Sequence, residues 1–67
     1  MKRIGIDVGG TFTDLILVDE EAGSSLVRKV PSTPDDPSRA VVEGVQGLCA
    51  AAGVALADID LILHGTT

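Results

Sequence analysis

Hydrophobic and polar residues alternate along the first thirty residues in a way that is typical of β-strands. Within residues 2–8, isoleucine or valine stands at every second position from residue 4, with charged residues or glycine between. Residues 13–19 (TDLILVD) form a second run that is apolar enough to be covered on both faces of a sheet. Residues 26–30 form a third run, in which Arg28 and Lys29 are typical of an edge strand. The short links between these runs predict an antiparallel meander.

A helix is predicted after a proline-rich loop. Three prolines in residues 31–37 exclude regular structure there. Asp36 is placed to be the N-cap of a helix, and Pro37 suits its first position. Apolar residues then recur at helical spacing to about residue 52, and Gly53 is a natural C-terminal stop.

A fourth strand is predicted at residues 58–64, after the helix. Because the chain crosses over through a helix, this strand should run parallel to an earlier one, beside the first. Gly44 and Gly47 lie inside the helix, where each costs about 1 kcal/mol relative to alanine, so we expect them to allow close packing on the sheet. The sequence thus predicts an α/β fold: a three-stranded antiparallel meander, one helix and a parallel fourth strand.

Composition narrows the classes of partner. Ten acidic residues against five basic ones give a net charge of −5, which argues against a nucleic-acid partner. Cys49 is the single cysteine, so an internal disulfide is excluded, and its apolar helical setting predicts a small buried side chain. The chain shows neither a signal-peptide pattern nor an apolar run of membrane-spanning length, so we expect a cytoplasmic protein without a membrane partner.

The link between the first two strands has the composition of a loop that faces phosphate. Glycines let backbone N–H groups approach an anion closely, and threonine hydroxyls add donors. Asp7 and Asp14 flank this link and are candidates to hold a divalent cation or its water shell, or to position an attacking group. The candidate phosphate-binding residues of the link are Gly9, Gly10, Thr11 and Thr13.

Plainer interpretations of these residues stay open at this point. Gly9 and Gly10 suit a tight hairpin, and Asp14 suits a cap for the backbone N–H groups of the link. Phe12 suits a core or a contact with another lobe, and His64 suits either a hydrogen-bonded structural residue or a catalytic base. One histidine and scattered acids predict no zinc site.

The order of elements, with an acid-Gly-Gly-Thr turn after the first strand, resembles the N-terminal subdomain of the actin, Hsp70 and sugar-kinase superfamily. Residues 7–14 (DVGGTFTD) are similar to the opening motif of the hydantoinase A and 5-oxoprolinase family, and residues 64–67 (HGTT) match a turn of that family. The resemblance implies a ribonuclease H-like half-domain. It also implies that residues 1–67 are the N-terminal fragment of a longer ATPase-like domain, as does a core strand followed by a polar turn.

The resemblance further implies a hydrolase that acts on small cyclic amides, with a hydantoinase B-type partner subunit or domain. It implies ATP and Mg²⁺ as cofactors, although some members act without ATP. Carried onto this chain, Asp7 would be catalytic and face the metal through water. The glycines and threonines of the link would contact phosphate, together with Thr66 and Thr67 from the neighbouring strand end. A second phosphate loop and an adenosine-binding segment are absent from these residues, so we expect the fragment alone to be inactive.

Two alternatives use the same turn. A glucokinase-type sugar kinase also opens with Asp-x-Gly-Gly-Thr, but lysine usually follows the threonine there, where this chain has Phe12. A non-catalytic nucleotide-binding module of the same fold is the other alternative. A P-loop NTPase is excluded because no Walker-type lysine follows the glycines, and their spacing does not support a Rossmann site. Unpaired strand edges predict that the fragment can form homo-oligomers.

Overall fold

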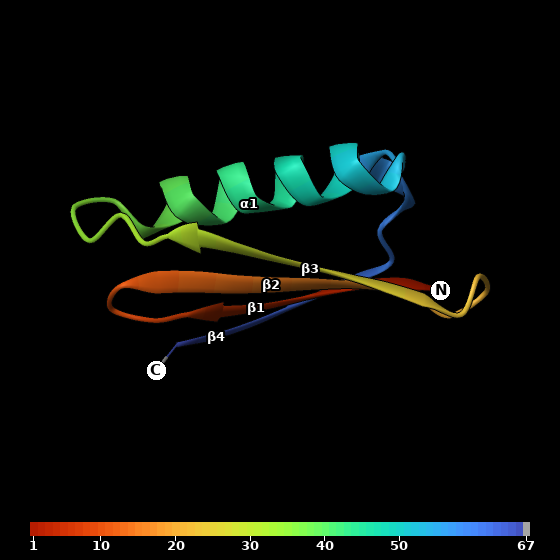
Figure 1. Cartoon of the computed structure of the whole chain (residues 1–67), viewed down its shortest axis with the longest axis horizontal. Helices are drawn as coiled ribbons and strands as arrows, with labels where there is room; N and C mark the ends of the chain where they lie inside the picture. Colours follow the sequence, from red (N-terminus) through yellow and green to blue (C-terminus); the bar gives the residue numbers. More distant parts are fainter. Residues whose placement is uncertain (67) are drawn as a thin grey trace.

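The computed structural model describes residues 1–66, and it shows a four-stranded sheet with one helix lying across one of its faces (Figure 1). The strands stand in the order β3-β2-β1-β4 across the sheet. The predicted β-β-β-α-β order is confirmed. In chain order the elements are β1 (Lys2–Val8), β2 (Phe12–Asp19), β3 (Ser24–Pro31), α1 (Pro37–Ala52), the short 3-10 helix η1 (Leu56–Asp58) and β4 (Leu61–Thr66).

The pairing of the strands follows the predicted topology. β1 pairs antiparallel with β2 and parallel with β4, which the chain reaches only after crossing over through α1. β3 pairs antiparallel with β2 and forms one edge of the sheet, as Arg28 and Lys29 indicated. β3 is longer than the predicted 26–30 because its pairing runs along the whole of β2, from Ser24 opposite Asp19 to Pro31 opposite Phe12.

The core lies between α1 and the face of the sheet that the helix covers. Alternate residues of β1 and β2 point into it, including Ile4, Ile6, Leu15 and Leu17. Leu48 of α1 is fully buried against them. This alternation is the period of two that predicted the strands, so hydrophobic burial on this face fixes the register of the sheet.

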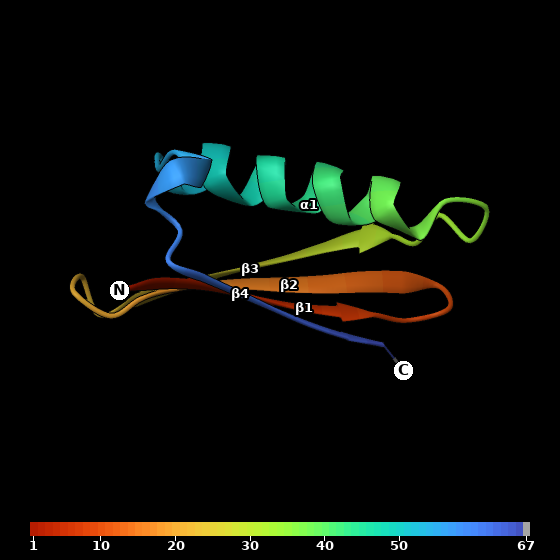
Figure 2. The same ribbon diagram turned by 180° about the vertical axis from the view of Figure 1, so that it is seen from behind.

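The opposite face of the sheet, which we call the open face, carries no helix in the part of the chain that the structure describes (Figure 2). Ile16, Val27 and Leu63 are exposed on it. The expectation that β2 is covered on both faces is therefore wrong for residues 1–66. The reason is that the described chain supplies one long helix, which covers one face only.

Helix α1 has the predicted bounds, and its ends differ in how they are capped. Pro37 is its first residue, and Asp36 stands at the N-cap position without a side-chain cap bond. Asp36 instead accepts a hydrogen bond from the Ser38 hydroxyl at 2.6 Å. Gly53 ends the helix in the left-handed conformation, with φ of 70°, as predicted.

The two glycines inside α1 both allow a close approach, but to different neighbours. A Cβ atom on Gly44 would lie 2.6 Å from Cδ1 of Leu15, so glycine lets the helix pack tightly on β2. A Cβ atom on Gly47 would lie 2.6 Å from Nε of Arg28, which crosses from β3. Close packing on the sheet is confirmed at Gly44, while Gly47 makes room for a flexible side chain.

Strand β4 begins later than predicted, at Leu61 and not at residue 58. Asp58 belongs to η1, where its backbone N–H donates to the carbonyl oxygen of Ala55. Asp60 then joins the start of β1: its N–H donates to the carbonyl of Lys2 at 2.8 Å, and its carboxylate accepts the N–H of Lys2 at 2.8 Å. These contacts turn the chain before the strand starts.

Cys49 is buried in the core, as predicted, and its thiol is free. Among the described residues, no helix has the length and hydropathy that crossing a membrane requires.

Candidate functional site

The ends of β1 and β4 lie on the same rim of the sheet, as expected for neighbouring parallel strands. The register places Asp7 beside Gly65 and Val8 beside Thr66. Figure 1 shows the end of β4 on the same side as the connection between β1 and β2. The backbone of Thr66 therefore reaches the rim. The expected phosphate contact of its side chain, and that of Thr67, lie outside what the structure describes.

The connection between β1 and β2, which we call the glycine turn, consists of residues 9–11. The N–H of Gly9 donates to the carbonyl of Phe12 at 3.0 Å and closes the turn. Gly10 and Thr11 are exposed, and their N–H groups have no acceptor within residues 1–66. Backbone donors at an exposed turn are accessible to water or to an anion.

Nothing in the described structure requires glycine at position 10. A Cβ atom there would meet no atom within 4 Å, and the backbone of Gly10 is not left-handed. Among the described glycines, positive φ angles occur at Gly23 and Gly53. The turn does join β1 and β2 as an antiparallel hairpin, but it is not of the I′ type, which needs positive φ at both central residues. The absence of a side chain at Gly10 keeps the space in front of the turn open.

Thr13 does not lie with the exposed residues of the turn. Its side chain is completely buried on the face that α1 covers, and its hydroxyl is 3.0 Å from the hydroxyl of Ser32. Thr13 therefore holds the turn from inside the molecule. The sequence predicted that the Thr13 hydroxyl contacts phosphate. Such a contact would require this hydroxyl to give up its hydrogen bond to Ser32.

Asp7 and Asp14 stand directly opposite each other on the open face, and both are exposed. The Asp14 carboxylate lies 3.8 Å from Nζ of Lys29, and that ammonium lies 5.2 Å from the ring centroid of Phe12. The Asp7 carboxylate has no ion pair or hydrogen bond within residues 1–66. The expected cap by Asp14 is not formed with any described N–H group, because its carboxylate pairs with Lys29 instead.

The open face has a hollow beside these carboxylates. Its lining includes Gly5 and Gly65, which have no side chains, and Ile16 and Leu63, which do. Among the described residues there is no group of three or more histidine, cysteine or acidic side chains that could hold a metal ion by itself. Mg²⁺ typically keeps several waters and binds one or two carboxylates together with phosphate oxygens. The Asp7 carboxylate suits such a shared site.

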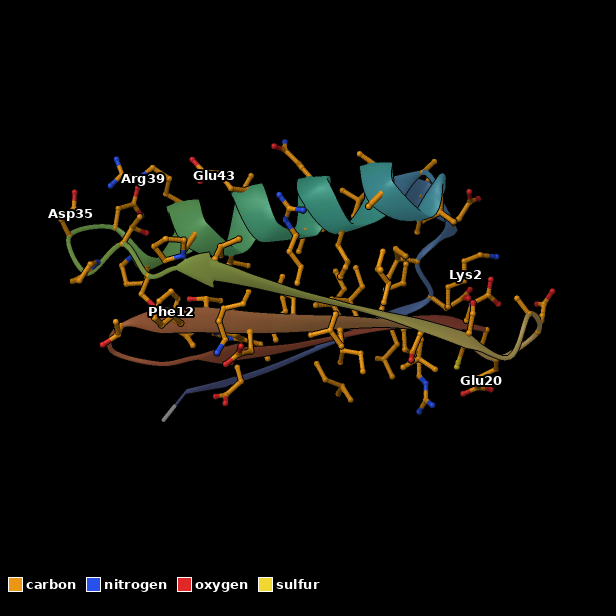
Figure 3. The ribbon with its side chains drawn as sticks, in the orientation of Figure 1. Lys2, Phe12, Glu20, Asp35, Arg39 and Glu43 are labelled. Carbon is orange, nitrogen blue, oxygen red and sulfur yellow. The ribbon has the colours of Figure 1, made fainter. Side chains whose placement is uncertain are left out.

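Phe12 is 45% exposed on the open face, so it is not a core residue. Figure 3 shows it near the glycine-turn end of the sheet, with Glu20 at the other end.

His64 pairs with Ile6 in the register of β4 and β1. It lines a cleft on the helix side of the sheet, which Val41 of α1 also lines. The structure thus places His64 and Asp7 on different faces of the sheet.

Ser32 contacts the glycine turn, and sequence reasoning missed it. Its hydroxyl donates to the carbonyl of Gly9 at 2.6 Å, and its N–H donates to the carbonyl of Thr11 at 2.8 Å. Ser32 stands 23 residues after Gly9, so no local pattern links them. The available signal was the alternation of Thr13 with Leu15 and Leu17, which puts Thr13 on the buried face and in need of a polar partner.

Comparison with known proteins identifies the family of this chain. A family model described as the hydantoinase/oxoprolinase N-terminal region matches residues 3–67. The chain belongs to the hydantoinase/oxoprolinase family. Both the residues 7–14 and the residues 64–67 that carried the resemblance lie inside this match.

Relatives from three organisms match nearly the whole chain. It is 45% identical over 69 residues to the caprolactamase subunit alpha of Pseudomonas jessenii, covering 97% of this chain and 10% of that protein. It is 37% identical over 71 residues to the acetophenone carboxylase gamma subunit of Aromatoleum aromaticum, covering 100% and 9%. It is 38% identical over 65 residues to an uncharacterised protein of Methanocaldococcus jannaschii, covering 97% and 9%.

The chain therefore spans about a tenth of the length of the curated relatives it matches. Two of those relatives are named as subunits of enzymes. The family assignment favours the hydantoinase interpretation of the glycine turn over the glucokinase-type alternative.

Proposed function

We propose that this chain is the N-terminal segment of a hydantoinase/5-oxoprolinase-type hydrolase that acts on cyclic amides, and that its glycine turn is the first phosphate-binding loop for ATP. Two features of this turn together support the proposal: backbone N–H groups that are unpaired among the described residues, and open space beside a glycine. The N–H groups of Gly10 and Thr11 have no acceptor among residues 1–66, and the space where a Gly10 side chain would stand is open. Together, the two free donors and the open space leave room for a phosphate oxygen in front of the turn.

Each residue at the rim has a role in this proposal. The N–H groups of Gly10 and Thr11 would bind phosphate oxygens, with the Thr11 hydroxyl as a further donor. The exposed Asp7 carboxylate would hold Mg²⁺ through water, and its own charge would then be balanced by the cation. ATP with Mg²⁺ would supply the phosphoryl group that activates the amide. The segment at Thr66 and Thr67 would line the same cleft from the end of β4.

The proposal includes a partner subunit or domain of the hydantoinase B type. The support is that the relatives from Pseudomonas jessenii and Aromatoleum aromaticum are named as alpha and gamma subunits. The small share of those proteins that the chain covers agrees with a segment that contributes one loop to a larger cleft.

The test uses the complete protein that carries this chain, together with its partner subunit. Phosphate release from ATP is measured with Mg²⁺ in the presence of hydantoin, 5-oxoproline or caprolactam. Wild type is compared with Asp7→Ala and Gly10→Val. We expect substrate-stimulated release that both substitutions abolish.

Other outcomes overturn particular parts of the proposal. Ring opening without ATP consumption would support the proposed hydrolase activity and contradict the proposed role of the turn in binding a nucleotide. Nucleotide binding without any reaction would leave a non-catalytic binding module. Phosphorylation of a sugar in place of amide hydrolysis would contradict the proposed activity.

A further inference from the structure

Ser32, the first residue after β3, makes hydrogen bonds to both limbs of the glycine turn. Its hydroxyl oxygen lies 2.6 Å from the carbonyl oxygen of Gly9, and its backbone N–H donates to the carbonyl oxygen of Thr11 at 2.8 Å. The same hydroxyl lies 3.0 Å from Oγ1 of Thr13. Ser32 thus connects the loop before α1 to the start of the turn through its hydroxyl and to the end of the turn through its backbone N–H.

The direction of these bonds follows from the single proton of a hydroxyl group. Ser32 gives its proton to Gly9, because a carbonyl oxygen can only accept. Thr13 must then be the donor to Ser32, so the hydrogen bonds run from Thr13 to Ser32 to Gly9. Thr13 is completely buried and Ser32 is half-buried, so the Thr13 end of this chain of bonds is shielded from competition with water.

The bond to Gly9 also sets the direction of the Gly10 N–H group. The carbonyl of Gly9 and the N–H of Gly10 belong to one peptide unit, and the described chain has no cis peptide bond. In a planar trans unit these two groups point in opposite directions. Holding the carbonyl of Gly9 toward Ser32 therefore aims the N–H of Gly10 away from the protein interior, where an anion can reach it.

We propose that Ser32 is a positioning residue of the phosphate loop: it holds the Gly9 carbonyl inward so that the Gly10 N–H is presented to a nucleotide phosphate. This inference rests on the proposed function of the turn. An unheld peptide unit could rotate and present the carbonyl oxygen, which repels phosphate.

The neighbouring hydroxyl provides a matched control. Thr33 also lies in the loop before α1, but its hydroxyl accepts the N–H of Ala40 at 3.2 Å and donates to the carbonyl of Asp36. It contacts the start of the helix and makes no hydrogen bond to the glycine turn within the described residues. Thr33→Ala therefore removes a hydroxyl of the same loop without releasing Gly9.

The experiment measures two quantities on the complete protein: the Kd of a non-hydrolysable ATP analogue with Mg²⁺, by calorimetry, and the Tm without nucleotide. We expect Ser32→Ala to raise the Kd by about tenfold. Ser32→Thr, which keeps the hydroxyl, should stay within about threefold of wild type. Thr33→Ala should lower the Tm and leave the Kd unchanged.

Each contrary result has a defined meaning. If Gly10→Val binds the analogue as wild type does, the turn is no phosphate loop and the proposed function fails. If Gly10→Val abolishes binding but Ser32→Ala changes only the Tm, the turn binds phosphate and the positioning role of Ser32 is wrong. Equal effects of Ser32→Ala and Thr33→Ala on the Kd would also contradict that role.

Discussion

At the residue scale, substitutions at Gly44 and Gly47 distinguish the effect of tight packing from the effect of helix propensity. A Cβ atom on Gly44 would lie 2.6 Å from Cδ1 of Leu15, which is 1% exposed and has no room to move. We expect Gly44→Ala to lower the free energy of unfolding by about 1–2 kcal/mol, because overpacking exceeds the gain in propensity. Gly47→Ala displaces only the exposed end of Arg28 and should be neutral or stabilising by up to about 1 kcal/mol.

Denaturant unfolding of the two variants checks this prediction, and each is the control for the other. Losses of stability of the same size at both positions would mean that helix α1 packs less tightly on β2 than the structure indicates.

Asp7 provides a second prediction at this scale, in which stability and activity change in opposite directions. The carboxylates of Asp7 and Asp14 stand opposite each other, and only Asp14 has an ion-pair partner within residues 1–66. Like charges directly opposite in a sheet are destabilising. We therefore expect Asp7→Asn to raise the free energy of unfolding without nucleotide by up to about 1 kcal/mol, while ATP hydrolysis with Mg²⁺ falls.

Unfolding at low ionic strength and the hydrolysis assay measure the two effects, with Glu43→Gln as a control at an exposed site on α1. A loss of stability in Asp7→Asn would contradict the idea that Asp7 is kept for binding.

At the element scale, the end of α1 depends on a backbone conformation that glycine tolerates. Gly53 has φ of 70°, and its N–H and that of Val54 bond to carbonyls of the last turn. We expect Gly53→Ala to lower the free energy of unfolding by about 1 kcal/mol, because Cβ disfavours the left-handed region. Gly10→Ala, which lacks that strain, is the control. An unchanged Tm in Gly53→Ala would contradict the capping role.

The helix and strands also show which parts of the fold could be predicted from the sequence. Alternation and helical spacing predicted β1, β2 and α1 because burial on one face dictates those patterns. The start of β4 was placed too early, since the bonds between Asp60 and Lys2 join residues 58 apart in sequence. Ser32 was missed for the same reason. Contacts between distant segments leave no periodic signal, so the turn itself was predictable but the bonds that hold it were not.

At the scale of the whole molecule, the open face predicts self-association of the 67-residue chain. Val27 and Leu63 are 66% and 58% exposed there, and β3 and β4 leave unpaired edges. We expect the mean mass in sedimentation experiments to rise between micromolar and millimolar concentration, and Val27→Lys to reduce that rise. Val42→Lys makes the same charge change on α1, at a residue 52% exposed, and should have no effect. Equal behaviour of both variants would contradict association through the open face.

We propose that the glycine turn is shaped for a phosphate and not for the fold, and the variant Gly10→Ala separates these two roles. The measurement is the Kd of a non-hydrolysable ATP analogue with Mg²⁺, alongside the Tm without nucleotide, in the complete protein. A Cβ atom at Gly10 meets nothing within 4 Å, so the Tm should not fall. We predict that the Kd rises by about tenfold or more at an unchanged Tm. Wild-type affinity in Gly10→Ala, or a large loss of Tm, would contradict the claim.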